Sequence, residues 1–315
     1  MGQKVVALGG GHGLAATLTA LRKITPNITA IVTVADNGGS SGRLRREFPI
    51  LPPGDLRMAL AALCADDEWG REWARIMQHR FTGDGSLNGH AVGNLLLAAL
   101  WDRDADPVVG LDRVASLLKV IGRVLPMASE PLDIEGTFLT SEGREVIRGQ
   151  AEVATASGKL QSLRIIPHDP PARDETLSAI AEADWITMGP GSWFSSVLPH
   201  LLVPMQRRAL CESGAKKIVL LNLDATPEST GTEFAGYSPE EHLGLISEYA
   251  PELKTDIVLA DTSVVKDESL LMRQVERMGG QLIVADLRKE PGSVHHNVDK
   301  LALQLGHIMS NSLIG

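Results

Sequence analysis

The sequence predicts an α/β protein with a Rossmann-like, doubly wound and mostly parallel sheet. Its opening stretch combines a run over residues 4–8 that is dominated by Val, Ala and Leu with four glycines within residues 9–13. Leu14, Leu18 and Leu21 then recur at helical spacing, so the pattern is a strand, a glycine turn and a helix. Apolar strand-like runs alternate with helical patterns along most of the chain, which is typical of a parallel sheet.

The other elements follow in chain order. We expect strands at 28–34, 163–167, 185–188, 217–223, 257–260 and 282–285, and helices at 54–64, 68–79, 89–100, 110–121, 174–183 and from about 299. Between residues 132 and 160, short alternating β-prone pieces separated by turn residues predict a small antiparallel β excursion. Because no repeat or linker divides the chain, we expect a single domain over residues 1–315.

The composition argues against several classes of function. The net charge is −9, so no overall positive potential attracts nucleic acid or an anionic membrane. The two cysteines, Cys64 and Cys211, form no C-x-x-C pair, as expected for a reducing cytoplasm and for a protein without a zinc cluster. No apolar run reaches the roughly 18 residues of a membrane helix, and no signal-peptide pattern precedes the first strand. We therefore expect a cytoplasmic protein that does not insert into a membrane.

Gly10, Gly11, His12 and Gly13 form the first candidate ligand site. Glycines leave backbone N–H groups uncovered and the start of a helix adds positive partial charge, so this turn suits a phosphate. The dinucleotide pattern G-x-G-x-x-G is met only in its alanine form, ending at Ala16, and no G-x-x-x-x-G-K-[ST] loop occurs. A nucleotide is favoured. An NAD-dependent oxidoreductase stays open, and so does a tight turn that binds nothing.

The loop after the second expected strand is the next candidate. It contains Asp36, Asn37, Gly38, Ser40 and Ser41, whose hydroxyls and bare amides suit an oxyanion. Parallel strands end at one edge of the sheet, so this loop should lie beside the first glycine turn. Asp36 has three possible roles: it binds a ribose diol, it holds a metal, or it only caps the loop through backbone hydrogen bonds.

The same loop satisfies G-x-S-x-G, the nucleophile elbow of α/β-hydrolases, over residues 38–42. That elbow needs a helix immediately after the serine. The following run, Arg43-Leu44-Arg45-Arg46, makes a poor apolar helix face, so a serine hydrolase is not favoured.

Charged residues near this loop could complete a diphosphate site. We expect Arg43 and Arg57 to grip phosphate bidentately. Gly54 and Asp55 precede a helix, where Asp55 either caps that helix or, together with Asp36, holds Mg²⁺ shared with a phosphate.

Two further groups are candidates. His90 and Asn94 are expected four residues apart on one helix face, where they either contact a ligand or form a core contact. Gly189, Gly191 and Ser192 follow another expected strand and form a second anion turn. Two such turns on one sheet edge could hold the two ends of one ligand.

Taken together, these stretches resemble one family: the gluconeogenesis factors of the YvcK type, relatives of 2-phospho-L-lactate transferase (CofD type). The matching runs are L-G-G-G-H-G-L from Leu8, T-V-A-D-N-G-G-S-S-G-R-L-R from Thr33, P-P-G-D-L-R from Pro52, L-N-G-H-A-V-G-N-L-L from Leu87 and G-P-G-S from Gly189. The second run favours the gluconeogenesis-factor branch. One departure is the run from Asp224 to Thr230, where the family often has M-T-Q-P-G-E-T.

The resemblance implies a cytoplasmic bacterial protein that binds a nucleotide sugar such as UDP-N-acetylglucosamine without turning it over. It implies a role in cell shape and envelope synthesis on gluconeogenic carbon sources, with envelope-synthesis proteins as partners and room for a homo-oligomer. The alternative is a transferase that moves a phospholactyl group from a guanosine-diphosphate donor to a deazaflavin. Mg²⁺ bound with the nucleotide is the one cofactor expected, and no residue is assigned as catalytic.

Overall fold

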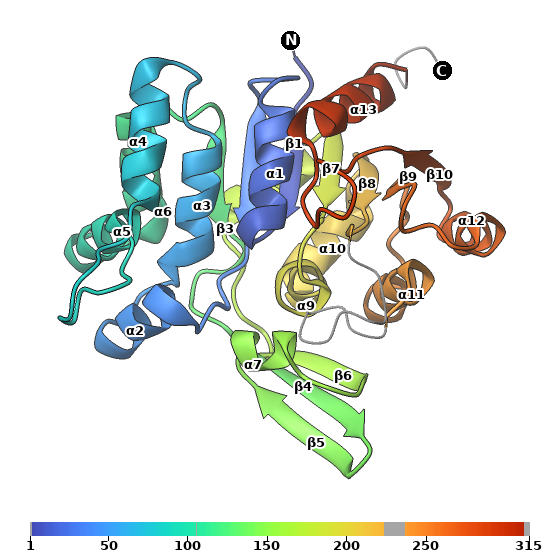
Figure 1. Ribbon diagram of the computed structural model, residues 1–315, viewed down its shortest axis with the longest axis horizontal. Coiled ribbons are helices and arrows are strands. Elements are labelled where there is room, and N and C mark those ends of the chain that lie inside the picture. The colour runs from blue at the N-terminus through green and yellow to red at the C-terminus, as the bar shows by residue number, and fades with distance from the viewer. Residues whose placement is uncertain (1, 105, 224–236, 312–315) are drawn as a thin grey trace.

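The computed structural model describes residues 2–104, 106–223 and 237–311, and its centre is a parallel sheet of seven strands (Figure 1). The strands are β1 (Val5–Gly9), β2 (Ile28–Val32), β3 (Arg123–Pro126), β7 (Trp185–Met188), β8 (Lys216–Leu220), β9 (Ile257–Asp261) and β10 (Gln281–Ala285). They lie in the order β10-β9-β8-β7-β1-β2-β3. The direction of the order reverses between β1 and β7, which confirms the doubly wound fold class and makes a topological switch point there.

Helices flank this sheet. They are α1 (Gly11–Leu21), α2 (Gly39–Glu47), α3 (Pro53–Ala62), α4 (Glu68–Gln78), α5 (Val92–Arg103), α6 (Pro107–Leu118), α8 (Asp174–Ala181), the π-helix η1 (Trp193–Val197), α9 (Pro199–Leu202), α10 (Pro204–Glu212), α11 (Pro239–Tyr249), α12 (Glu268–Arg277) and α13 (Val298–Asn311). Helix α1 packs beside α3 and α13, and α8 packs beside α10. Strands β1 and β7 are buried at every residue, as their unbroken apolar runs predict for the middle of a parallel sheet. Within the described ranges, no helix has the length and apolar character needed to cross a bilayer.

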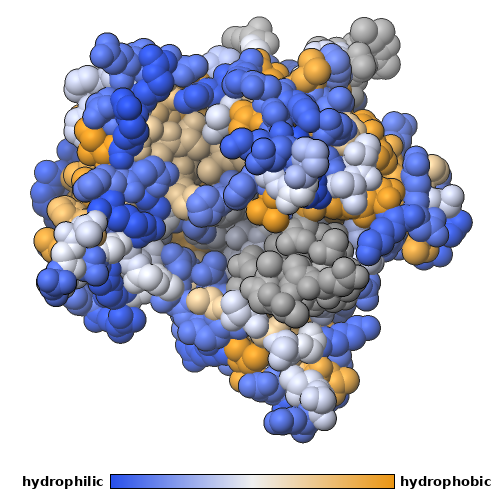
Figure 2. Space-filling view, viewed as in Figure 1, coloured by the Kyte–Doolittle hydropathy of each residue, from blue (hydrophilic) through white to orange (hydrophobic). Residues whose placement is uncertain are grey.

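A small antiparallel sheet interrupts the chain between β3 and β7. It consists of β4 (Asp133–Thr140), β5 (Gly143–Arg148) and β6 (Lys159–Ile166) in the order β5-β4-β6, with α7 (Gln150–Ala154) between β5 and β6. Figure 1 shows it standing apart below the parallel sheet. Hydrophobic residues lie among hydrophilic ones on its surface (Figure 2), where Leu139 and Val146 are exposed. The expected antiparallel excursion is thus present.

The predicted strand at 163–167 is wrong as a member of the parallel sheet. Residues 163–166 belong to β6 and pair antiparallel with β4. On the other side of β6, the hydroxyls of Tyr237 and Tyr249 accept hydrogen bonds from the backbone N–H groups of Leu160 and Leu163. These two backbone donors of β6 are therefore satisfied by side chains.

Residues 43–46 do make a poor apolar face, but they lie in α2, so the inference that no helix follows the serines is wrong. The buried face of α2 is small and polar, formed by Ser40, Ser41 and Gly42 together with Leu44. A methyl group on Gly42 would lie 1.9 Å from the carbonyl oxygen of Asn37, so close backbone packing takes the place of an apolar face. Six residues separate β2 from α2, and this spacing is not the sharp strand-to-helix turn of a nucleophile elbow.

Other differences concern elements and their ends. His90 precedes α5, whose N-cap is Ala91, so His90 and Asn94 do not share a helix face. The expected strands 28–34 and 217–223 end earlier, at residues 32 and 220. The sequence patterns also gave no indication of β3 or of six further helical segments: α7, η1, α9, α10, α11 and α12.

Candidate functional site

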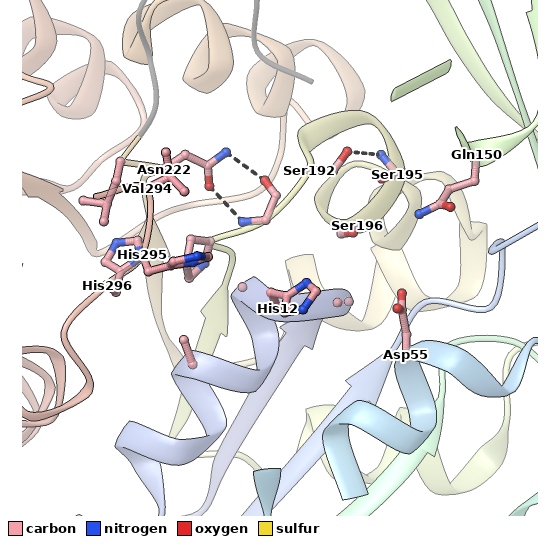
Figure 3. Close-up of a pocket in the computed structure, with 17 residues that line it drawn as sticks. His12, Asp55, Gln150, Ser192, Ser195, Ser196, Asn222, Val294, His295 and His296 are labelled. Atoms are coloured by element: carbon pink, nitrogen blue, oxygen red, sulfur yellow. Dashed lines mark hydrogen bonds between the residues drawn. The ribbon is translucent and has the colours of Figure 1, made fainter. Parts of the chain in front are cut away.

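The candidate site is a pocket of about 530 Å³ at the carboxyl ends of β1 and β7, beside the switch point (Figure 3). Glycines, hydroxyls, amides and imidazoles make up most of its walls. The lining residues are Gly10, Gly11, His12, Gly13, Ala16, Asp55, Gln150, Pro190, Gly191, Ser192, Ser195, Ser196, Asn222, Leu223, Val294, His295 and His296. Its position and volume are typical of a small-molecule site in an α/β protein.

The first wall is the glycine turn at the start of α1. Gly10 is the N-cap and supplies no side-chain acceptor to the first turn of the helix. Gly11 has a φ of +59°, which glycine adopts without strain. The backbone N–H groups of the first turn and the positive end of an 11-residue helix therefore lie at the pocket, an arrangement that suits an anion.

The second wall is the glycine turn after β7, and it packs directly on the first. A methyl group on Gly13 would lie 2.1 Å from the carbonyl oxygen of Pro190 and 2.9 Å from Cα of Gly191. Only glycine at position 13 allows the two turns to come this close. Ser192 is the N-cap of η1, and its Oγ accepts a hydrogen bond from the backbone N–H of Ser195.

Asp55 is the carboxylate of the pocket. Its Oδ2 accepts a hydrogen bond of 3.1 Å from Oγ1 of Thr33, and the backbone N–H of Gly11 also donates to it. Burial raises the pKa of Asp55 to about 7, and the negative charge of Asp36 adds to this shift. Asp55 therefore changes its protonation state near neutral pH.

Asp36 lies near Asp55 but not on the pocket wall. Its Oδ1 accepts a hydrogen bond from the backbone N–H of Gly38, while Ser41 accepts one from the N–H of Gly54 at the start of α3. Among the described residues, no group of three or more histidine, cysteine, aspartate or glutamate side chains could hold a metal ion. Two carboxylates are nevertheless enough for Mg²⁺ when a phosphate and water supply the other ligands. Asp36 and Asp55 are the residues that would hold it.

Several predicted ligand residues contact other parts of the protein instead. Ser40 Oγ bonds to Nδ1 of His90 at 2.9 Å and accepts a bond from Nδ2 of Asn94, so the predicted pair meets through a buried serine. Asn37 holds α7, donating to Glu152 and accepting from the N–H of Ala151.

Neither of the two expected arginines lines the pocket. Arg43 donates to the backbone carbonyls of Ser86 and Asn88, and Arg57 is buried and donates to Gln78. Burial lowers the pKa of Arg57 to about 10. No arginine or lysine occurs among the described lining residues, so backbone amides and the α1 N-terminus supply most of the positive potential there.

The pocket also contains residues that sequence patterns did not single out: Gln150, Ser195, Ser196, Asn222, Val294, His295 and His296. Figure 3 shows His12 near the centre, with His295 and His296 on one side and Asp55 and Gln150 on the other. Burial lowers the pKa of His296 to about 4, so this imidazole is neutral at pH 7. Asn222 follows a parallel strand, so the strand-end rule that identified Asp36 could also have identified it. Gln150 and the histidines come from distant segments and left no local signal.

The chain is similar to known proteins along nearly its whole length. Residues 5–299 match the family model described as 2-phospho-L-lactate transferase CofD. A Mycobacterium tuberculosis protein named "Putative gluconeogenesis factor" is 46% identical over 98% of this chain and 91% of its own length. A Listeria innocua protein named "Gluconeogenesis factor" is 33% identical over 98% of this chain and 96% of its own length. The crystal structure of a UPF0052-family protein from Bacillus halodurans superposes with a TM-score of 0.84 at 32% identity, covering 97% of this chain and 99% of that one.

Proposed function

The chain belongs to the family of 2-phospho-L-lactate transferase CofD and resembles its members named gluconeogenesis factors, and from that premise we propose that it binds a nucleotide sugar of the UDP-N-acetylglucosamine type. In this proposal the protein is a regulator that does not turn its ligand over. It acts in the cytoplasm on cell shape and envelope synthesis during growth on gluconeogenic carbon sources, through contacts with envelope-synthesis proteins.

The observation that carries the proposal is that two glycine turns meet at the switch point and open into one pocket. A helix N-terminus with bare amides favours a phosphate, and nucleotides bind at this place in doubly wound sheets. The rest of the pocket offers hydroxyls and an amide, from Ser195, Ser196 and Gln150. Such groups can hydrogen-bond a sugar or a base, which supports a ligand with both a diphosphate and a sugar.

Thermal unfolding against a ligand panel tests this proposal. The panel is UDP-N-acetylglucosamine, UDP-glucose, GDP, GTP and NAD, each with and without Mg²⁺. A ligand at a hundred times its Kd stabilises the folded protein by about 2.7 kcal/mol, a readily measured rise in melting temperature. We expect a rise with a UDP sugar and none with NAD. A clear rise with NAD while UDP sugars have no effect would refute the proposal.

The transferase is the second candidate, and the shifted pKa of Asp55 favours it. The raised pKa of Asp55 arises from burial and from the negative charge of Asp36, and a cation bound between the two carboxylates would relieve this repulsion. Asp36 and Asp55 would hold Mg²⁺, which would neutralise the charge of a diphosphate donor. In the same panel, this candidate predicts that guanine nucleotides raise the melting temperature only when Mg²⁺ is present, and that UDP sugars do not.

A further inference from the structure

Two side chains hold the second glycine turn: Thr17 Oγ1 donates to the carbonyl oxygen of Gly189 at 3.3 Å, and the side chain of Asn222 bonds to Gly191. The Nδ2 of Asn222 donates to the carbonyl oxygen of Gly191, and its Oδ1 accepts from the N–H of the same residue, both at 2.8 Å (Figure 3). The backbone pairing of β7 with β8 ends at Met188 and Val219. The amide of Asn222 therefore takes over where the ladder of backbone hydrogen bonds stops.

Asn222 is itself fixed on both sides. The backbone N–H of Leu221 donates to the carbonyl of Leu259 on β9, and the guanidinium of Arg288 donates to the carbonyl of Leu223. The side chain of Asn222 is 8% exposed. Hydrogen bonds to Leu259 and Arg288 thus fix the backbone from which the side chain of Asn222 reaches Gly191.

The effect of Asn222 reaches the first glycine turn. Gly191 follows Pro190, whose carbonyl oxygen is the atom packed against Gly13 at the start of α1. The position of Gly191 therefore affects how far apart the two turns lie. A site binds tightly only when its groups are already held close to the geometry that the ligand requires.

We infer that Asn222 is a positioning residue, which sets the second glycine turn at the separation from the first turn that the ligand requires. This inference rests on the proposed function, since the ligand is the nucleotide sugar proposed above. The amide oxygen and one amide N–H both bond Gly191, so we assign Asn222 an action on the ligand through the turn.

The test compares affinity with stability in Asn222→Ala. The control is Thr176→Val, which also removes a buried side-chain bond to a backbone carbonyl, that of Pro126, but away from the pocket. Calorimetric titration with UDP-N-acetylglucosamine, at a temperature where all variants are folded, should show at least a tenfold weaker affinity for Asn222→Ala. The control should bind within twofold of wild type although its melting temperature also falls. Wild-type affinity in Asn222→Ala, or an equal loss in the control, would overturn the inference.

Two additions keep the outcome decisive. If Asn222→Ala does not fold, Asn222→Ser replaces it, because a serine side chain is too short to span both bonds, and the same results are expected. Hydrogen exchange of the Gly191 amide, measured without ligand, should be faster in the variant while the Ile186 amide on β7 is unchanged. Unchanged exchange at Gly191 contradicts the inference. Failure of the wild-type protein to bind any UDP sugar contradicts the proposed function instead.

Discussion

His200 shows how a single buried residue supports the first glycine turn. The side chain is 1% exposed, and its Nε2 lies 3.3 Å from the carbonyl oxygen of Gly9. Its Nδ1 accepts a hydrogen bond of 2.9 Å from Nε2 of Gln206, so the ring is neutral and its Nε2–H points at Gly9. Burial lowers the pKa of His200 to about 4. The neutral imidazole of His200 thus holds the carbonyl group at the end of β1 through a hydrogen bond.

We expect the unfolding free energy of His200→Gln at pH 7.5 to be about 1–3 kcal/mol below that of wild type. The buried carbonyl of Gly9 and the amide of Gln206 both lose their imidazole partner. In the unfolded wild-type chain His200 is protonated below about pH 6.5, whereas in the folded protein it is protonated only below about pH 4. Its contribution to stability is therefore lost as the pH falls from about 6.5 to 4. Urea unfolding of both proteins should show the difference between them shrinking over that interval. A difference that stays constant with pH would contradict the assignment of a neutral His200.

The contact between α1 and the turn after β7 is the decisive one between elements. It depends on the missing side chain at Gly13, because the nearest atoms belong to the backbone of Pro190 and Gly191 and cannot rotate away. The two turns form one pocket only while this contact holds. Replacing one hydrogen atom of Gly13 by a methyl group should therefore disturb both walls at once.

We expect Gly13→Ala to cost about 2 kcal/mol or more of unfolding free energy, as for overpacking of a rigid site, and to weaken binding of UDP-N-acetylglucosamine at least tenfold. Gly244→Ala is the matched control. Gly244 lies in α11 with no atom within 4 Å of an added methyl group, so alanine there should stabilise the helix by up to about 1 kcal/mol. Chemical unfolding and calorimetric titration of both variants provide the measurements. Wild-type affinity in Gly13→Ala would show that the ligand does not depend on the contact between the turns.

At the scale of the whole molecule, the pocket is lined both by turns of the parallel sheet and by the segment that carries the small antiparallel sheet. Gln150, at the start of α7, lines the pocket, and Asn37 holds α7 through Ala151 and Glu152. Strand β5 is exposed along almost its whole length and lies at the outer edge of the small sheet. The excursion therefore contributes to the site through α7, while β5 does not touch the pocket.

We expect a bound UDP sugar to slow amide hydrogen exchange in α7 but not in β5. Ligand contacts at Gln150 should hold the short helix closed more of the time, whereas the exposed strand gains no new contact. Exchange measured by mass spectrometry with and without UDP-N-acetylglucosamine gives the comparison. Equal slowing of both segments, or no slowing of α7 by a ligand that binds, would contradict the placement of Gln150 in the site.

Much of the fold was predictable because its strongest signals are local. The apolar run and glycines of residues 4–13, the strand at 185–188 and the helix at 68–79 combine periodicity with turn chemistry, and all occur close to where we expect them. Helix α2 was missed because its buried face is made of serines and a glycine, which no apolar pattern marks. Strand β3 was missed because four residues ending in proline give no period to detect.

For the site, the two glycine turns and Asp55 were predicted from local chemistry. Uncovered backbone N–H groups that follow a strand suit a phosphate in any doubly wound sheet. Local chemistry could not tell that Arg57 is buried against Gln78, or that Arg43 binds the loop that ends at Asn88. The departure noted at Asp224–Thr230 lies outside the described residues. The histidines at 295 and 296 join the pocket, and His200 supports Gly9, through contacts between segments far apart in sequence. Such contacts depend on how helices and strands pack in three dimensions, and packing leaves no pattern in any one stretch of the chain.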